Sequence, residues 1–452
     1  MPDLPLAHPP PPASDARRMT TLKTTEHGPI PVVLVVAGCT DERDLEADRT
    51  QEMINLLDTA GRRVVATATQ HLPKIAAGTY IGSGKITEVK ALMKEHGAEE
   101  AAFDVSLSPR QQRNLEESLE TPVLDYDEII LNIFASNART HQARLAVELA
   151  KTQYTRGRLR RMWTHLDRQR AGGGGGGGSG FLTGTGEKQI EMDRRLARKK
   201  IQDLRGQLDE IAERADRSVQ TRAKAFNIAL VGYTNAGKST LMNALTGAGV
   251  LAENRLFATL DTRTARLRLG EHRNIVLSDT VGFIRNLPHS LIASFHATLS
   301  EVREADLLLH VVDSASPVME EQIAAVTTVL ETIEAHQVPM ITVFNKIDAC
   351  PSRTVLAAVR RRHKGAVALS AQTGEGLETL REAIAAQVEK TTATAEVRYP
   401  VTDGATDAWI RARSAIRAER LDGETMVLTI AADEDILGEL EGRAKVTRPR
   451  SR

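Results

Sequence analysis

A glycine-rich loop carries the clearest chemical signal in the sequence. It consists of Gly232, Tyr233, Thr234, Asn235, Ala236, Gly237, Lys238 and Ser239. An apolar segment precedes it and a helical segment follows it, which is the strand-loop-helix context of a P-loop. In such a loop backbone N–H groups bind phosphate oxygens, the lysine contacts the β- and γ-phosphates, and the serine hydroxyl binds Mg²⁺. We therefore expect a nucleoside triphosphate with Mg²⁺ here, and Lys238 as a catalytic group.

A second motif indicates which base is bound. The apolar segment 339–344 ends in Asn345, Lys346, Ile347 and Asp348. A carboxylate at Asp348 can accept hydrogen bonds from both N1 and the exocyclic amine of guanine, and a mismatch of buried hydrogen bonds rejects an analogue strongly. The backbone of a third loop should contact the guanine carbonyl; it contains Ser370, Ala371 and Gln372. These motifs favour GTP, and they disfavour a small-molecule kinase, which has no need of the second one.

Two further segments should sense the γ-phosphate and complete the metal site. The first contains Asp279, Thr280, Val281 and Gly282. We expect Asp279 to hold Mg²⁺ through water and the Gly282 amide to meet the γ-phosphate in catalysis. The second contains Phe257, Ala258, Thr259, Leu260 and Asp261. Thr259 is the expected catalytic switch residue and the second protein ligand of Mg²⁺ beside Ser239, with Thr262 and Thr264 as alternatives.

Phe283 follows Gly282, at the position where Ras-like enzymes have the glutamine that orients the attacking water. A phenyl ring cannot orient water. We therefore expect slow unaided hydrolysis that a partner accelerates.

The elements that position these residues alternate between strand and helix, which predicts an α/β fold. We expect a disordered tail (1–28), a small parallel α/β domain (29–137), an antiparallel helical hairpin (138–225), a P-loop GTPase domain (226–390) and a short C-terminal α/β extension with a basic tail (391–452). The hairpin is predicted from two heptad-like apolar stripes on either side of a glycine-rich loop, 172–180.

Basic residues gather near that loop: Arg156, Arg158, Arg160, Arg161, Arg168 and Arg170 before it, and Arg194, Arg195, Arg198, Lys199 and Lys200 after it. A charged, solvated coiled-coil surface explains them structurally. The scarcity of acidic residues between 151 and 170 favours a phosphate-rich partner, because clustered arginines release counterions when they bind phosphates.

Composition narrows the class of protein. Formal charges balance at zero, so only local basic clusters could bind nucleic acid. The two cysteines, Cys39 and Cys350, indicate neither a disulfide framework nor a zinc site. The sequence has no apolar run long enough to span a membrane, and its proline-rich start does not read as a secretion signal. We expect a cytoplasmic protein.

The wording of these motifs resembles the HflX family of translational GTPases, and the resemblance extends over about residues 30–390. It is carried by the P-loop and by residues 256–261, 279–288, 80–85, 107–115, 139–149 and 184–195. Thr185, the Arg156–Arg158 stretch and the pure glycine run depart from the family's usual pattern. Residues 82–85 we interpret as a turn that opens a helix, not as a second nucleotide site.

The resemblance implies a GTPase that binds the large ribosomal subunit, contacts its ribosomal RNA through the hairpin loop, and splits or rescues stalled ribosomes under stress. We also expect a monomer off the ribosome. Two alternatives stay open. One is a ribosome-assembly GTPase that leaves mature ribosomes intact. The other is an RNA-binding module that holds nucleotide without splitting ribosomes.

Overall fold

The computed structural model describes residues 28–39, 46–162, 183–219, 226–247, 257, 263–269, 274–285, 291, 296–350, 361–363, 365–390, 393–432 and 434–447. The chain divides into two compact units, Met1–Ser136 and Asn137–Arg452. Residues 1–27 of the predicted tail 1–28 lie outside the described residues, and so does the glycine-rich loop 172–180. No helix in the described part of the chain combines the length and the apolar character that a membrane span requires.

The first unit is built on a four-stranded parallel sheet in the order β2-β1-β3-β4. Its elements are β1 (Ile30–Cys39), α1 (Glu46–Thr59), β2 (Arg62–Leu72), α2 (Ser83–His96), β3 (Glu100–Phe103), α3 (Pro109–Leu119), β4 (Val123–Leu124) and α4 (Tyr126–Asn137). Val33 and Val35 on β1 pack with Val89 of α2 and Leu115 of α3, while their neighbours Val32 and Leu34 are equally buried. Burial on both faces is the property of a parallel sheet covered by helices.

Gly82 precedes α2 as its N-cap, so residues 82–85 form a turn that opens a helix, as the sequence predicts.

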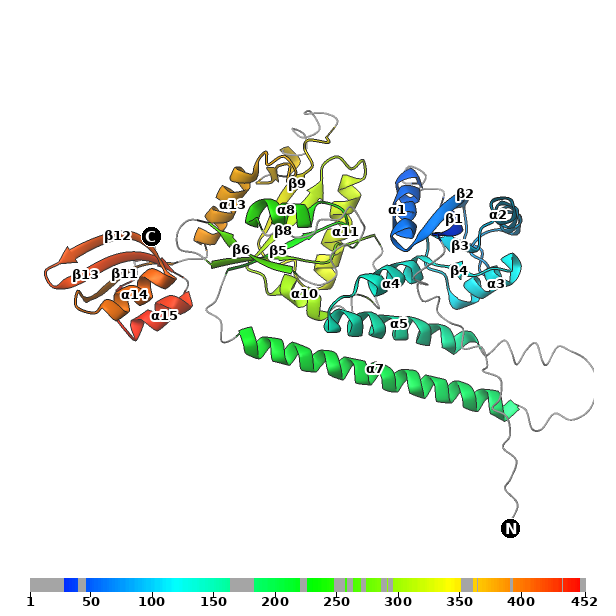
Figure 1. Ribbon diagram of the computed structural model, residues 1–452, viewed down its shortest axis with the longest axis horizontal. Coiled ribbons are helices and arrows are strands. Elements are labelled where there is room, and N and C mark those ends of the chain that lie inside the picture. Colours follow the sequence, from blue (N-terminus) through cyan, green and yellow to red (C-terminus); the bar gives the residue numbers. More distant parts are fainter. Residues whose placement is uncertain are drawn as a thin grey trace, which may run out of the picture. The chain divides into compact units, whose positions relative to one another are not determined.

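Two long helices begin the second unit. Helix α5 (His141–Met162) and helix α7 (Thr183–Val219) pack against each other, and Figure 1 shows them side by side. Leu149 on α5 and Ile201 and Leu204 on α7 are buried, and Lys200 Nζ lies 2.7 Å from Glu148 Oε1 across the pair. These contacts confirm the helical pair that the apolar stripes predict.

The central six-stranded sheet of the second unit has the order β10-β9-β8-β5-β7-β6 and is parallel except for β6, which runs antiparallel to β7. Its strands are β5 (Phe226–Gly232), β6 (Arg263–Arg268), β7 (Asn274–Asp279), β8 (Leu307–Asp313), β9 (Met340–Asn345) and β10 (Val367–Ala368). Its helices are α8 (Lys238–Thr246), α10 (His296–Arg303), α11 (Met319–Thr332) and α13 (Leu377–Lys390). After β5 the chain forms β6 and β7 on one side of this strand and then crosses to β8 on its other side. Open α/β sheets bind ligands where the strand order reverses in this way.

The C-terminal sheet is antiparallel, in the order β12-β13-β11-β14. Its elements are β11 (Ala393–Pro400), α14 (Gly404–Arg413), β12 (Ala415–Asp422), β13 (Thr425–Ala432), α15 (Glu434–Glu441) and β14 (Lys445–Thr447). This βαββαβ order is that of a split βαβ, ferredoxin-like unit. The described elements of this region agree with the short α/β extension that the sequence predicts.

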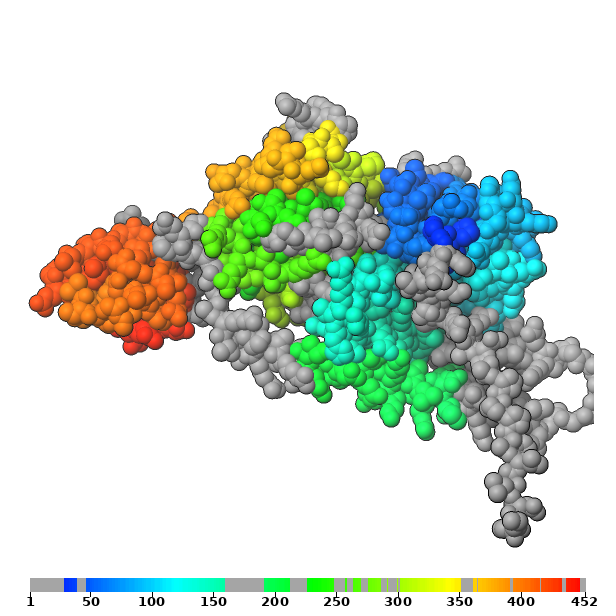
Figure 2. All heavy atoms as spheres, in the orientation of Figure 1, coloured from blue at the N-terminus to red at the C-terminus, as the bar shows by residue number. Residues whose placement is uncertain are grey.

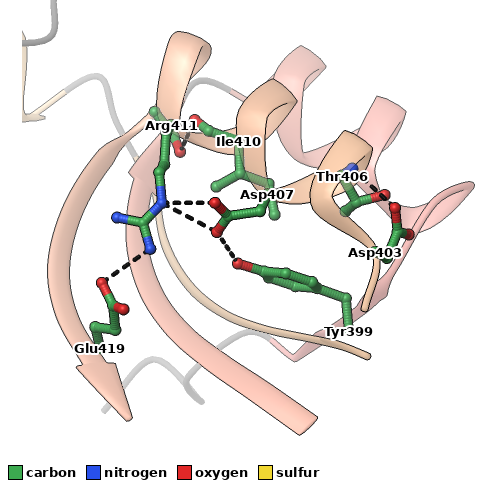
Figure 3. A network of polar contacts seen from close by, with 8 residues as sticks. Tyr399, Asp403, Thr406, Asp407, Ile410, Arg411 and Glu419 are labelled. Atoms are coloured by element: carbon green, nitrogen blue, oxygen red, sulfur yellow. Dashed lines mark hydrogen bonds and ion pairs between the residues drawn. The ribbon is translucent and has the colours of Figure 1, made fainter. Parts of the chain in front are cut away.

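A polar network fastens α14 to this sheet (Figure 3). The Tyr399 hydroxyl on β11 donates to Asp407 at 2.5 Å, and Arg411 donates to both carboxylate oxygens of Asp407 at 2.9 and 3.0 Å. Arg411 also reaches Glu419 on β12 at 3.0 Å. One helix is thereby joined to two strands of the sheet.

Candidate functional site

The P-loop turns between β5 and α8 at two positions that require glycine. At Gly232 the backbone φ is 152° and an added Cβ would lie 2.2 Å from the Val311 carbonyl oxygen. At Gly237 φ is 92° and an added Cβ would lie 2.3 Å from Asn345 Nδ2. A side chain at Gly232 would clash with the Val311 backbone, and one at Gly237 would clash with the Asn345 side chain. These two glycines therefore set the path of the loop.

Lys238, the first residue of α8, is folded back onto the loop. Its Nζ donates to the Gly232 carbonyl at 3.1 Å and the Tyr233 carbonyl at 2.9 Å. Burial lowers the pKa of the Lys238 ammonium to about 8, against the opposing effect of the Asp279 charge. A bound phosphate would favour the charged form, which is what a P-loop lysine needs.

Ser239 and Asp279 bring two hard oxygen donors together at the start of α8. The Ser239 hydroxyl donates to Asp279 Oδ2 at 2.5 Å, and Asp279 is fully buried. The next residue, Thr280, donates through its hydroxyl to the Leu230 carbonyl at 2.6 Å and so ties the end of β7 to β5. Mg²⁺ prefers one or two oxygen side chains plus phosphate oxygens, so this pair fits that ion.

The predicted switch segment is described only at Phe257. That residue is buried, has a left-handed backbone with φ 57°, and its carbonyl accepts from Asn137 Nδ2 at 2.9 Å. The remaining residues of the segment and one of the two alternatives to Thr259 lie outside the described residues: Ala258, Thr259, Leu260, Asp261 and the alternative Thr262. Thr264 is on β6, paired with Ser278 of β7.

Asn345 joins the loop after β9 to both neighbouring loops. Its Nδ2 donates to the Ala236 carbonyl of the P-loop at 2.9 Å, and its Oδ1 accepts from the Ala371 amide at 2.9 Å. The first contact ties this loop to the P-loop. The second shows that the Ala371 amide already has a partner within the protein, so a contact of this loop with guanine stays a prediction.

The other residues of the base motif have different surroundings. Asp348 is exposed and Lys346 half-buried, with a left-handed backbone of φ 62°. Lys346 Nζ lies 2.7 Å from Asp313 Oδ2, and Ile347 is half-buried. The Ser370 hydroxyl accepts from the Thr373 amide at 3.1 Å and Gln372 is exposed. The Asp348 carboxylate is exposed and Lys346 is held by Asp313, so this motif is suited to a guanine base that enters from solvent.

Sequence reasoning missed Asp313. Asp313 is the last residue of β8, and all the residues before it in that strand are buried. It pairs with Asn345 of β9 in the register of the sheet. An acidic residue at the end of a buried parallel strand was the available signal, because carboxyl ends of such strands meet at one edge of the sheet.

A P-loop after the central strand of a mostly parallel sheet, joined by Asn345 to a loop with an exposed aspartate, defines a P-loop GTPase. Comparison with known families agrees. A family described as "50S ribosome-binding GTPase" matches residues 227–346, "GTP-binding GTPase N-terminal" matches 47–135, and "GTP-binding GTPase Middle Region" matches 137–222.

Individual relatives narrow the class. "GTPase HflX" of Magnetococcus marinus is 43% identical over 87% of this chain and 90% of its own length, and "GTPase HflX" of Escherichia coli is 42% identical over 82% and 86%. A GTP-binding protein from Sulfolobus solfataricus, solved with GDP, is 22% identical over 80% of this chain and 99% of its own, with a TM-score of 0.41. The chain belongs to the HflX family of GTPases. It is therefore an enzyme that hydrolyses GTP.

Proposed function

We propose that this GTPase binds the large ribosomal subunit and splits or rescues stalled ribosomes, with its hydrolysis accelerated by that subunit. It acts in the cytoplasm, under stress, and as a monomer off the ribosome. The observation that carries the proposal is Phe283, which is 1% exposed and lies against the P-loop where a water-orienting side chain is needed. An enzyme with an apolar side chain there needs a partner to complete its site.

The nature of the partner is supported by charge. Arg195, Arg198, Lys199 and Lys200 are exposed on α7, and Figure 2 shows this helix, in green, at the surface of the molecule. Arg156 is exposed on α5. Clustered guanidinium and ammonium groups bind nucleic-acid phosphates. The family description "50S ribosome-binding GTPase" supports a ribosomal partner, and we propose that its ribosomal RNA supplies the phosphates.

Within the nucleotide site we propose a role for each predicted residue. Lys238 and the backbone of residues 232–239 hold the β- and γ-phosphates, Asp348 reads guanine, and Gly282 senses the γ-phosphate. Ser239 and Thr259 hold Mg²⁺, which when bound neutralises charge on the phosphates. Asn345 keeps the phosphate and base loops in register. We further propose that residues 138–225 and 226–390 act as the RNA-contacting and nucleotide-binding parts, beside the N-terminal domain 29–137 and the C-terminal extension 391–452.

The test is a light-scattering assay on purified intact ribosomes. Wild-type protein with a non-hydrolysable GTP analogue should lower the scattering as subunits separate, and GDP should not. The Lys238→Ala variant should fail, while the exposed Lys390→Ala variant should act normally. Scattering that stays constant while the protein cosediments with free large subunits would favour the assembly alternative and contradict splitting.

A further inference from the structure

The segment from Gly282 to Arg285 is closed onto the P-loop by backbone hydrogen bonds. The Phe283 amide donates to the Gly232 carbonyl at 3.0 Å, and the Thr234 amide donates to the Phe283 carbonyl at 2.7 Å. Tyr233 and Phe283 thereby form a parallel β-bridge. The amide of a P-loop residue is thus occupied by the segment that follows β7.

Gly282 lies directly against the ammonium group of the P-loop. A Cβ added to it would be 3.1 Å from Lys238 Nζ and 3.0 Å from Thr234 Cα. The P-loop lysine contacts both the β- and the γ-phosphate. The Gly282 backbone packed beside Lys238 and Thr234 would crowd a γ-phosphate bound to that ammonium group, and GDP has no γ-phosphate. GTP therefore requires this segment to move, and GDP does not.

One side chain of the P-loop also holds the segment. Tyr233 is 6% exposed, and its hydroxyl accepts from the Arg285 amide at 2.9 Å. Arg285 lies beyond Phe283, so this bond fixes the far end of the closed segment. Phenylalanine at this position would keep the ring packing and lose the acceptor. The Tyr233 hydroxyl therefore makes a hydrogen bond that is not required for the backbone N–H groups of the P-loop to bind phosphate.

We propose that Tyr233 is a positioning residue that sets the preference for GDP over GTP, because its hydroxyl bond to the Arg285 amide stabilises the closed form of residues 282–285 beside Lys238. The inference rests on the assignment of the P-loop under Proposed function. A ligand that fits only the open form must supply the free energy of opening, so weakening the closed form raises GTP affinity selectively.

The test compares the Tyr233→Phe variant with wild type by titration of a fluorescent GDP and of a fluorescent non-hydrolysable GTP analogue at fixed Mg²⁺. The lost bond is an ordinary neutral one, so the ratio of GTP-analogue to GDP affinity should rise about 2- to 10-fold. With GDP bound, amide exchange of a peptide covering 281–285 should also become faster. Tyr399→Phe is the matched control, because it removes a hydrogen-bonded tyrosine hydroxyl from the C-terminal sheet instead.

Three results would overturn the proposal: an unchanged affinity ratio, a ratio shifted toward GDP, or an equal loss of affinity for both nucleotides. The last would make Tyr233 a packing residue of the loop. Failure of the site assignment itself looks different, because Lys238→Ala would then bind both nucleotides normally.

Discussion

The Asn345 side chain links the phosphate-binding loop of the candidate nucleotide site to the loop after β10. With its nitrogen bonded to Ala236 and its oxygen bonded to Ala371, it contacts the phosphate loop and the loop after β10 at once. It is 2% exposed, so neither bond competes with bulk water. A buried amide with both ends satisfied fixes loop positions well, because breaking either bond leaves a desolvated polar group. The exposed carboxylate of Asp348, three residues on, is thereby presented from a rigid base.

Base choice is tested at Asp348. Asp348→Asn should weaken GTP binding by about 100-fold or more, since the amide nitrogen cannot accept from guanine N1, and it should admit xanthosine triphosphate. Competition against a fluorescent nucleotide measures both affinities. The matched control is Glu375→Gln, which removes an exposed negative charge from a neighbouring loop. An unchanged order of base preference in Asp348→Asn would contradict the guanine assignment.

At the scale of elements, helices and strands with a regular apolar period could be predicted from the sequence. A helix buried on all sides and an exposed, charged edge strand could not. Helix α4 was missed because Ile129, Ile130, Leu131 and Ile133 are all buried, and a helix buried all round has no amphipathic period. Strand β12 was missed because Arg417–Asp422 are exposed and mostly charged, as edge strands often are.

The site shows the same division. The P-loop and the 345–348 motif are local in sequence, so their residue types and spacing were sufficient to place them. The bond from Arg285 to the Tyr233 hydroxyl joins residues 52 positions apart and depends on how β5 and β7 pair. The pairing of Lys346 with Asp313 likewise depends on the register of β8 with β9. Such contacts follow from sheet topology, which the sequence pattern left open.

The role of α7 is tested by charge reversal on its exposed face. Arg195→Glu combined with Arg198→Glu should weaken binding to large ribosomal subunits and flatten its salt dependence, with the slope of log affinity against log salt falling by up to about two. GTP turnover without ribosomes should be unaffected. Cosedimentation at several salt concentrations measures the slope.

Its control is Arg361→Glu combined with Arg362→Glu, which reverses two exposed charges in the G domain. Equal loss of binding in both double variants would mean a general charge effect. Normal binding by the α7 variant would return the hairpin to a purely structural role.

At the scale of the whole molecule, two sheets and a helical pair serve different purposes in one chain. The loops of the central sheet carry the residues that we assign to nucleotide binding. The α5–α7 pair carries the exposed basic face, and the C-terminal sheet has its own core around Val397, Leu428 and Leu437. In the cycle that we propose, nucleotide exchange opens residues 282–285, and the large subunit supplies the water positioning that Phe283 lacks.

The proposal that the large subunit accelerates hydrolysis is tested by steady-state GTP turnover at fixed salt. Turnover is measured with and without purified large ribosomal subunits, and with Lys238→Ala as the inactive reference. We predict a slow basal rate and a stimulation of at least about tenfold, because removal of one positioned catalytic contribution typically costs 10²- to 10³-fold. A turnover rate that stays the same when large subunits are present at saturating concentration would contradict the account.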